Sequence, residues 1–166
     1  MRRFIALFLL MLVMILFLFS TAVLAEEESP PAISAESALL MDADSRQVLY
    51  SKNENVQLPM ASTTKIMTAL VVLEQLPLDH VVTISAEAAG IEGSSVYLTA
   101  GEKVTVEDLL YALLLQSAND AAAALAIETA GSIEDFAVLM NEKATDLSLT
   151  HSSFSNPHGL DDESHY

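Results

Sequence analysis

The sequence contains no cysteine. A chain without thiols forms no disulfide bonds, so its fold must be held together by packing alone. Thiol-based catalysis and cysteine-ligated metal sites are excluded for the same reason.

Basic residues are scarce, with 7 Lys and Arg against 23 Asp and Glu and a formal net charge of −16. Nucleic acid is excluded as a partner, because phosphate binding needs clustered Lys and Arg that release counterions. The acidic surplus indicates a solvated surface that keeps the protein soluble. None of the 4 histidines lies in a His-Glu-x-x-His or similar pair, so we predict no metal and no other cofactor.

The first 25 residues have the order of a secretory signal peptide. Arg2 and Arg3 precede an uncharged apolar run over 4–25, and three glutamates follow. Val23-Leu24-Ala25 fits the signal peptidase pattern and predicts cleavage after Ala25. Retention as a membrane anchor is the alternative, since about 20 apolar residues can span a bilayer. Cleavage leaves 166 − 25 = 141 residues with a formal charge of 5 − 23 = −18.

Turn residues and apolar periodicity predict the organisation of the remainder. Residues 26–32, with two prolines, are expected to form a flexible leader. Short β-compatible runs around Asp42-Ala43-Asp44-Ser45 predict a hairpin from Ser37 to Ser51. Further strands are expected over 81–84 and 96–98, and helices over 62–75, from the Thr105 cap onward, over 120–130 and after the Ser132 cap. A lone hairpin is only marginally stable, so we expect its sheet to need further strands.

Ser62-Thr63-Thr64-Lys65 stands at the head of the first predicted helix. Residues three apart share a helix face, so the Ser62 hydroxyl and the Lys65 amine can lie within hydrogen-bonding reach. A serine becomes a strong nucleophile when a neighbouring base takes its proton, and a lysine kept neutral by desolvation can serve. The free amides of the first helical turn would favour a developing oxyanion. The alternative is that Ser62 is only a helix cap and Lys65 its solvated neighbour.

A second polar motif, Ser117-Ala118-Asn119, falls at a break between two predicted helices, where a loop can line a cleft. His158 lies among strong turn residues and is expected to have a structural role there. Tyr97 and Tyr111 are expected to be packing residues.

With these motifs in this order, the chain resembles the low-molecular-mass penicillin-binding proteins, specifically the serine-type D-alanyl-D-alanine carboxypeptidases. The resemblance rests on the hairpin and on residues 59–68, 115–122 and 156–161, and it covers nearly all of the chain after the signal. It implies an α+β fold of the β-lactamase/DD-peptidase kind, with an antiparallel sheet and a helical subdomain. It also implies that Ser117 relays a proton to the leaving group, while Asn119 binds the substrate amide and positions Lys65.

The expected partners follow from the same resemblance. They are peptidoglycan stem peptides ending in D-Ala-D-Ala, and β-lactam antibiotics, met outside the cytoplasm in the cell wall or at the outer face of the cytoplasmic membrane. Contact with the membrane is expected only through the signal segment or a C-terminal anchor. The family's third motif, Lys-Thr-Gly, is not in this sequence. We therefore expect residues 33–166 to be the N-terminal part of the catalytic domain. They are expected to be inactive alone, because the strand that carries the third motif in the family supplies one of the two oxyanion-hole amides.

Three alternatives stay open. A β-lactamase forms the same acyl-enzyme, but class A members have Asp in the middle of the second motif, where this chain has Ala118, and use a deacylating glutamate with no obvious counterpart here. A D,D-endopeptidase of the same fold is not separable by sequence. A non-catalytic binding module would fit the absent third motif but not the retention of Ser62, Lys65, Ser117 and Asn119.

Overall fold

The computed structural model describes residues 4, 5, 11 and 32–166. The predicted signal peptide and leader therefore fall almost entirely outside the described residues. The chain divides into two compact units, residues 1–54 and 55–166, which are described separately. Among the described residues, no helix has both the length and the apolar character needed to cross a bilayer.

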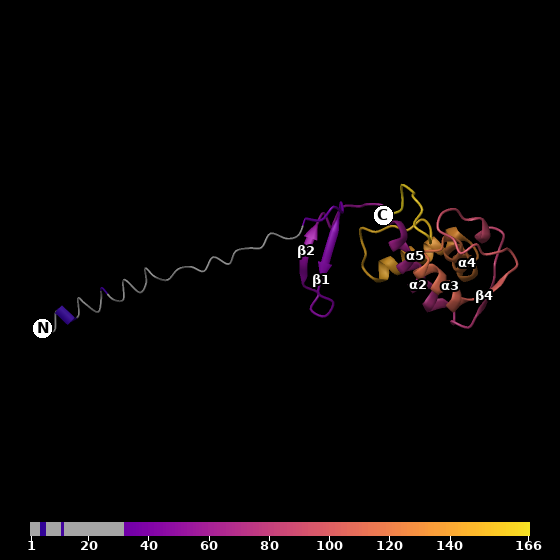
Figure 1. The fold of residues 1–166 in the computed structure, drawn as a ribbon, viewed down its shortest axis with the longest axis horizontal. Coiled ribbons are helices and arrows are strands. Elements are labelled where there is room, and N and C mark those ends of the chain that lie inside the picture. Colours follow the sequence, from indigo (N-terminus) through magenta and orange to yellow (C-terminus); the bar gives the residue numbers. More distant parts are fainter. Residues whose placement is uncertain (1–3, 6–10, 12–31) are drawn as a thin grey trace. The chain divides into compact units, whose positions relative to one another are not determined.

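The first unit contains the predicted hairpin (Figure 1). Strands β1 (Ala38–Met41) and β2 (Val48–Lys52) pair antiparallel. Asp42 closes the turn, since its Oδ1 accepts from the amide of Ser45 at 2.7 Å and from its hydroxyl at 2.6 Å. The hairpin prediction is confirmed, and its turn follows from an Asp side chain that bonds the backbone three residues on.

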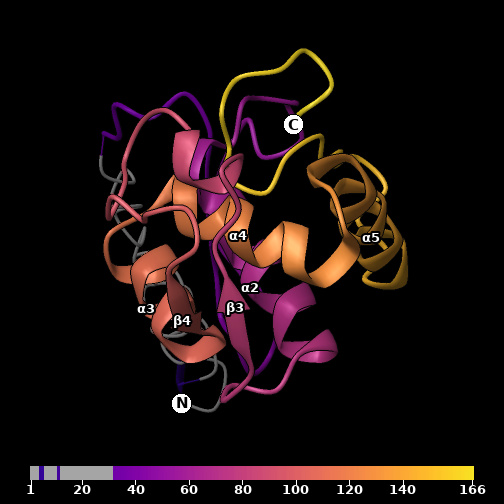
Figure 2. The same ribbon diagram turned by 90° about the vertical axis from the view of Figure 1, so that its right-hand side faces the viewer.

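The second unit is built around an alanine-rich helix. Helix α4 (Asn119–Ala130) contacts α2 (Thr64–Gln75), α3 (Val106–Leu115) and α5 (Ile133–Asp146), and Figure 2 shows it between α3 and α5. Every residue of α4 from Asn119 to Ala126 is buried. Small alanine side chains let three neighbouring helices approach closely, so α4 forms the centre of the core.

Local capping signals fix where these helices begin and end. Thr105 accepts a hydrogen bond from the Asp108 amide at 3.1 Å, and Ser132 does the same for Asp135 at 3.0 Å. Gly131 ends α4 with φ of 91°, a left-handed conformation that favours glycine. The predicted helix starts at Thr105 and Ser132 and the stop at Gly131 are confirmed.

One predicted strand is wrong. Strand β3 (Val81–Thr83) pairs antiparallel with β4 (Lys103–Thr105), and residues 96–98 form a loop. The Asp120 carboxylate, fully buried, accepts from the amides of Val96 at 3.2 Å and Leu98 at 2.9 Å. A side chain distant in sequence thus satisfies the donors that a strand would have offered to a neighbour.

Asp120 stays ionised despite its burial. Burial alone would raise its pKa, but hydrogen bonds from the Ser95 hydroxyl and from the Leu98, Val96 and Ala121 amides outweigh it and hold the pKa below its usual value. The ionised Asp120 side chain therefore holds the loop over 92–98 against the start of α4.

Candidate active site

Ser62 lies in a tight turn that precedes α2. The turn, η1 (Ala61–Thr63), is a 3₁₀ helix, so the regular α-helix begins two residues later than the predicted Ser62 start. Its first residue, Ala61, has φ of 47°. Left-handed backbone is costly for alanine and persists where surrounding contacts enforce it, as happens at functional sites. The Ser62 side chain is exposed and makes no capping bond.

The amides of the predicted first helical turn are not all free, which corrects that expectation. The Thr63 amide donates to the Met60 carbonyl at 3.3 Å, so it is already occupied in this turn. The 3₁₀ geometry causes this, because its hydrogen bonds reach back three residues rather than four.

Lys65 is buried, with 2% of its surface exposed, and is not the solvated neighbour of a cap. Its Nζ lies 2.7 Å from Asn119 Oδ1, 2.7 Å from the His158 carbonyl oxygen and 3.2 Å from Ser62 Oγ. The amide and carbonyl oxygens can only accept, so they take two N–H groups of the amine. The remaining tetrahedral position points at Ser62. It holds a hydrogen in the ammonium form and a lone pair in the neutral amine.

The surroundings of Lys65 shift its protonation equilibrium towards the neutral amine. Burial lowers the pKa of Lys65 below its usual value, because the low-dielectric interior disfavours the charged form. No carboxylate contacts its Nζ among the described residues, whose two ion pairs involve His80 and Lys143. In the neutral form of the amine, this geometry would aim the lone pair at the Ser62 hydroxyl.

Ser117 and Asn119 come from the link between α3 and α4. Ser117 has φ of 55°, and its hydroxyl donates to Ser62 Oγ at 2.7 Å. Asn119 opens α4, and its Nδ2 donates to the Glu92 carbonyl at 2.8 Å while Oδ1 receives Lys65. The structure thus brings Ser62, Lys65, Ser117 and Asn119 together, as predicted from the motifs.

A pocket of 370 Å³ opens beside these residues. Ser62, Lys65 and Ser117 form its polar side, and Ile66, Leu113 and Leu114 form its apolar side. Such a lining suits a small ligand that carries a polar reacting group and an aliphatic part.

The C-terminal tail supplies a group that sequence reasoning missed. The His158 carbonyl accepts from Lys65, and the Pro157 carbonyl accepts from Thr68 Oγ1 at 2.6 Å. Gly159 has φ of 84°, and a Cβ there would lie 1.9 Å from the Ala61 carbonyl oxygen. Figure 2 shows this yellow tail beside the purple turn before α2. A backbone carbonyl has no sequence signature; only the tightly packed Asn-Pro-His-Gly turn could have indicated it.

The His158 imidazole is neutral at physiological pH. Burial, the charge of Lys65 and the nearby His165 together lower the pKa of His158 to about 4. Its Nδ1 accepts from the Leu160 amide at 3.3 Å, which is a structural contact within the turn.

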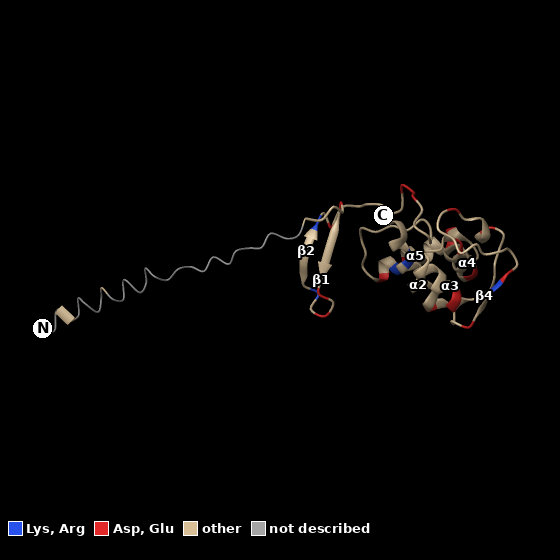
Figure 3. Cartoon of the chain, viewed as in Figure 1, with Lys and Arg blue, Asp and Glu red and all other residues tan. Residues whose placement is uncertain are grey.

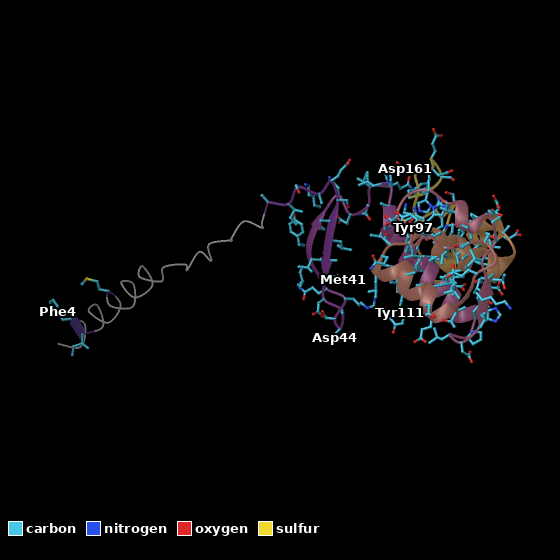
Figure 4. The ribbon with its side chains drawn as sticks, turned by 45° about the vertical axis from the view of Figure 1, so that its right-hand side comes forward. Phe4, Met41, Asp44, Tyr97, Tyr111 and Asp161 are labelled. Carbon is cyan, nitrogen blue, oxygen red and sulfur yellow. The ribbon has the colours of Figure 1, made fainter. Side chains whose placement is uncertain are left out.

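Two aromatic residues do not pack as predicted. Tyr97 is 87% exposed and Tyr111 is 58% exposed, and Figure 4 labels both on the second unit. Tyr97 has φ of 61° and lies between Val96 and Leu98, whose amides donate to the Asp120 carboxylate. Its side chain is left outside the core because the loop backbone, not the ring, makes the contacts.

The acidic side chains of the described residues form no set that resembles a metal site. Acidic side chains are dispersed over the loops and helices of the second unit (Figure 3). Among the described residues, no group of three or more His, Cys, Asp or Glu could hold a metal ion.

Comparison with known proteins supports the family resemblance that the sequence motifs indicated. The profile of a family described as D-alanyl-D-alanine carboxypeptidase matches residues 24–166. The chain is 43% identical over 140 residues to D-alanyl-D-alanine carboxypeptidase DacF of Bacillus subtilis, covering 81% of the chain and 36% of that protein. It is 36% identical over 156 residues to a D-alanyl-D-alanine endopeptidase of Pseudomonas aeruginosa, covering 87% and 50% respectively. The chain thus spans about a third to a half of these relatives.

The fold agrees with a solved structure of a protein of this kind. Penicillin binding protein 5 from Haemophilus influenzae superposes with a TM-score of 0.78 at 33% identity, over 83% of this chain and 42% of that one. The predicted fold class, antiparallel strands with a helical subdomain, is confirmed by this likeness.

Proposed function

Because this chain belongs to the D-alanyl-D-alanine carboxypeptidase family, we propose that the intact protein is a serine-type carboxypeptidase that removes the terminal D-alanine from peptidoglycan stem peptides. One observation carries this proposal: Lys65 Nζ is held by two acceptor oxygens so that its remaining position faces Ser62 Oγ at 3.2 Å. Acyl transfer needs a nucleophile and a base within reach of each other. It also needs further groups that orient the base.

The first half of the reaction forms an acyl-enzyme. Neutral Lys65 takes the Ser62 proton as Ser62 Oγ attacks the carbonyl carbon of the penultimate D-alanine. The tetrahedral adduct then collapses, the C–N bond breaks, and the terminal D-alanine leaves as its amine takes a proton. Ser117 is the proposed carrier of that proton, since its hydroxyl lies 2.7 Å from Ser62 Oγ, the atom that attacks the scissile carbonyl.

The second half restores the enzyme. Water attacks the Ser62 ester, Lys65 receives a proton from the water, and Ser62 Oγ regains one as the shortened peptide leaves. Every group needed for these steps is a side chain or an amide of the protein, so the proposed mechanism requires no cofactor.

Asn119 has a proposed double role. Its Oδ1 holds Lys65, and its Nδ2 uses one of two hydrogens on the Glu92 carbonyl, which leaves the other for a substrate amide oxygen. The same residues would react with β-lactams, whose strained amide takes the place of the D-alanyl-D-alanine bond. We propose these antibiotics as ligands on that ground.

We also propose an extracytoplasmic location. Residues 1–25 are the proposed signal peptide, 26–32 the leader, and 33–166 part of the catalytic domain. Peptidoglycan substrates lie outside the cytoplasmic membrane, so the proposed activity requires export.

A D,D-endopeptidase is the second candidate, favoured by the 36% identity to a protein with that name. Two substrates separate the candidates in the intact protein. A stem-peptide analogue ending in D-Ala-D-Ala should release D-alanine, and a cross-linked dimer should be cut more slowly. Preferential cutting of the dimer would favour the endopeptidase. Release of D-alanine from neither, with no reaction at Ser62, would point to a binding module.

A further inference from the structure

His165 is a buried residue that the mechanism above does not use. Only 3% of its surface is exposed, and its Nε2 lies 2.6 Å from the hydroxyl oxygen of Thr64, itself 1% exposed. Thr64 is the first residue of α2 and the neighbour of Lys65. A residue 101 positions away in the sequence thus contacts the helix at the point where the reacting groups begin.

The contacts of the ring fix its tautomer. The Ser155 amide donates to His165 Nδ1 at 3.0 Å. An amide N–H can only donate, so Nδ1 must carry a lone pair, and the proton of the neutral ring is on Nε2. Nε2–H therefore donates to Thr64 Oγ1. The imidazole bridges α2 and the tail, with one nitrogen committed to each.

Packing holds the ring in this orientation. The Phe154 ring meets it edge to face with centroids 5.8 Å apart. Both carbonyl and amide of Phe154 are bonded to the Asn141 side chain on α5, at 2.7 and 3.0 Å. Ser153 and Tyr166 pair through their backbones at 2.6 and 3.0 Å, which closes the tail into a loop. His165 is adjacent to the Ser153–Tyr166 pairing that closes that loop.

The loop in turn sets the position of Lys65. Between Ser155 and His165 the chain presents the Pro157 carbonyl to Thr68 and the His158 carbonyl to Lys65 Nζ. Asn156 Oδ1 accepts from the amides of His158 at 3.2 Å and Gly159 at 2.7 Å, so this segment is tied together by its own hydrogen bonds. A shift of Ser155 relative to Thr64 would therefore carry the His158 carbonyl away from the Lys65 amine.

We infer that His165 is a positioning residue for the acylation step. Its neutral ring ties Ser155 to Thr64 and thereby keeps the His158 carbonyl on Lys65, so that the lysine lone pair stays aimed at Ser62. This inference rests on the proposed function. It concerns a residue that never touches the substrate and acts only through the loop.

The arrangement has a consequence for pH. Protonation at Nδ1 would place a second donor against the Ser155 amide and break that bond. Of the charged groups around the ring, the Asp162 carboxylate raises the pKa of His165, whereas burial of the ring lowers it. Burial dominates and lowers the pKa of His165, so the bridge is intact at neutral pH and is lost as pH falls.

The test compares three variants of the intact protein by their second-order rate of labelling with a fluorescent penicillin. His165→Phe keeps a ring but loses both hydrogen bonds, and it should label about 100-fold more slowly at pH 7, as expected for a displaced reacting group. His165→Asn can still accept from Ser155, and His165→Gln can still donate to Thr64. Each should recover part of the loss. Leu147→Ala, an exposed change after α5, serves as the control and should label at the wild-type rate.

The pH profile separates positioning from mere stability. In wild type the acid limb should have a slope of one, from protonation of Lys65, and should steepen to two once His165 also takes a proton. His165→Gln should keep a slope of one throughout. A general loss of stability would lower the rate without removing the second step.

The outcomes distinguish this inference from the proposed function. A wild-type protein that penicillin does not label would overturn both. Labelled wild type with His165→Phe reacting at the same rate, or with the second slope still present in His165→Gln, would overturn this inference alone. If His165→Phe fails to fold, nitrogen NMR of the wild-type ring decides: a protonated Nδ1 at pH 7 contradicts the bridge, and a protonated Nε2 supports it.

Discussion

The amine of Lys65 faces the hydroxyl of Ser62 across 3.2 Å, while its other two directions are taken by the Asn119 side chain and the His158 carbonyl. The helix alone would place these side chains only near each other. The two acceptors, from α4 and from the tail, convert that proximity into a directed contact. Three segments distant in sequence are therefore needed to prepare one proton transfer.

Replacing Lys65 by Met should remove the base while keeping an apolar stem of similar length. General-base catalysis contributes about 10²- to 10⁴-fold, and coupling to the nucleophile can make the loss larger. Stopped-flow measurement of penicillin labelling in the intact protein checks this. Lys103→Met, an exposed lysine in β4, is the matched control and should label normally. Equal rates for the two variants would mean that Lys65 takes no proton.

Gly159→Ala should disrupt the contact between the tail and the turn before α2. The new Cβ would lie 1.9 Å from the Ala61 carbonyl oxygen, at a backbone φ of 84°. Gly101 is the matched control, because its φ is 85° but nothing lies within 4 Å of its Cβ position. Gly101→Ala should cost about 1–2 kcal/mol, from left-handed backbone alone. Gly159→Ala should cost about 3 kcal/mol or more, since overpacking adds to that strain.

Urea unfolding of both glycine variants, with penicillin labelling, measures these effects. Gly159→Ala should lose labelling rate as well as stability, whereas Gly101→Ala should lose stability only. Equal losses in both would show that the tail does not rest on the Ala61 turn.

Stability should fall as pH drops below about 6.5, where the unfolded His158 side chain takes up a proton. The folded protein resists this because burial, Lys65 and His165 lower the pKa of His158 to about 4. The unfolded state therefore binds more protons throughout that window, and folding loses about 3 kcal/mol, an order-of-magnitude figure, by pH 4. Above pH 6.5 this residue contributes no pH dependence.

The measurement is the free energy of unfolding in urea between pH 7 and pH 4. His158→Gln should flatten part of the decline, and a control change at the exposed His151 should leave it as in wild type. An unaltered decline in His158→Gln would show that the His158 imidazole is not kept neutral by the fold.

Export should begin with residues 1–25 and leave a mature chain starting at Glu26. The physical reason is the basic start, the apolar run and the small residues before the cleavage point. N-terminal sequencing of the protein collected outside the cytoplasm checks the site. Material that begins at Met1 would instead support retention as an anchor.

Local signals made much of the helical unit predictable. Thr105, Gly131 and Ser132 act on backbone groups within three or four residues, so their effect can be read from a short window. The four motif residues could also be located, because Ser62 and Lys65 share one turn and Ser117 and Asn119 share one helix break.

Long-range contacts explain what could not be predicted. The loop over 96–98 has the composition of a strand, but the buried Asp120 takes its amide hydrogens. The His158 carbonyl and the His165 ring reach α2 only after the tail has folded back, and neither is marked by a local pattern. Tyr97 and Tyr111 look like core residues by type, yet the loop and helix that carry them leave both rings exposed.

Mass spectrometry of the intact protein after incubation with penicillin tests the central claim most directly. We predict a single covalent adduct, mapped by peptide digestion to Ser62, that is absent from the Ser62→Ala variant and is formed far more slowly by Lys65→Met. An adduct of the same yield in Ser62→Ala, or no adduct in a folded wild-type protein, would contradict the assignment of Ser62 as the nucleophile and Lys65 as its base.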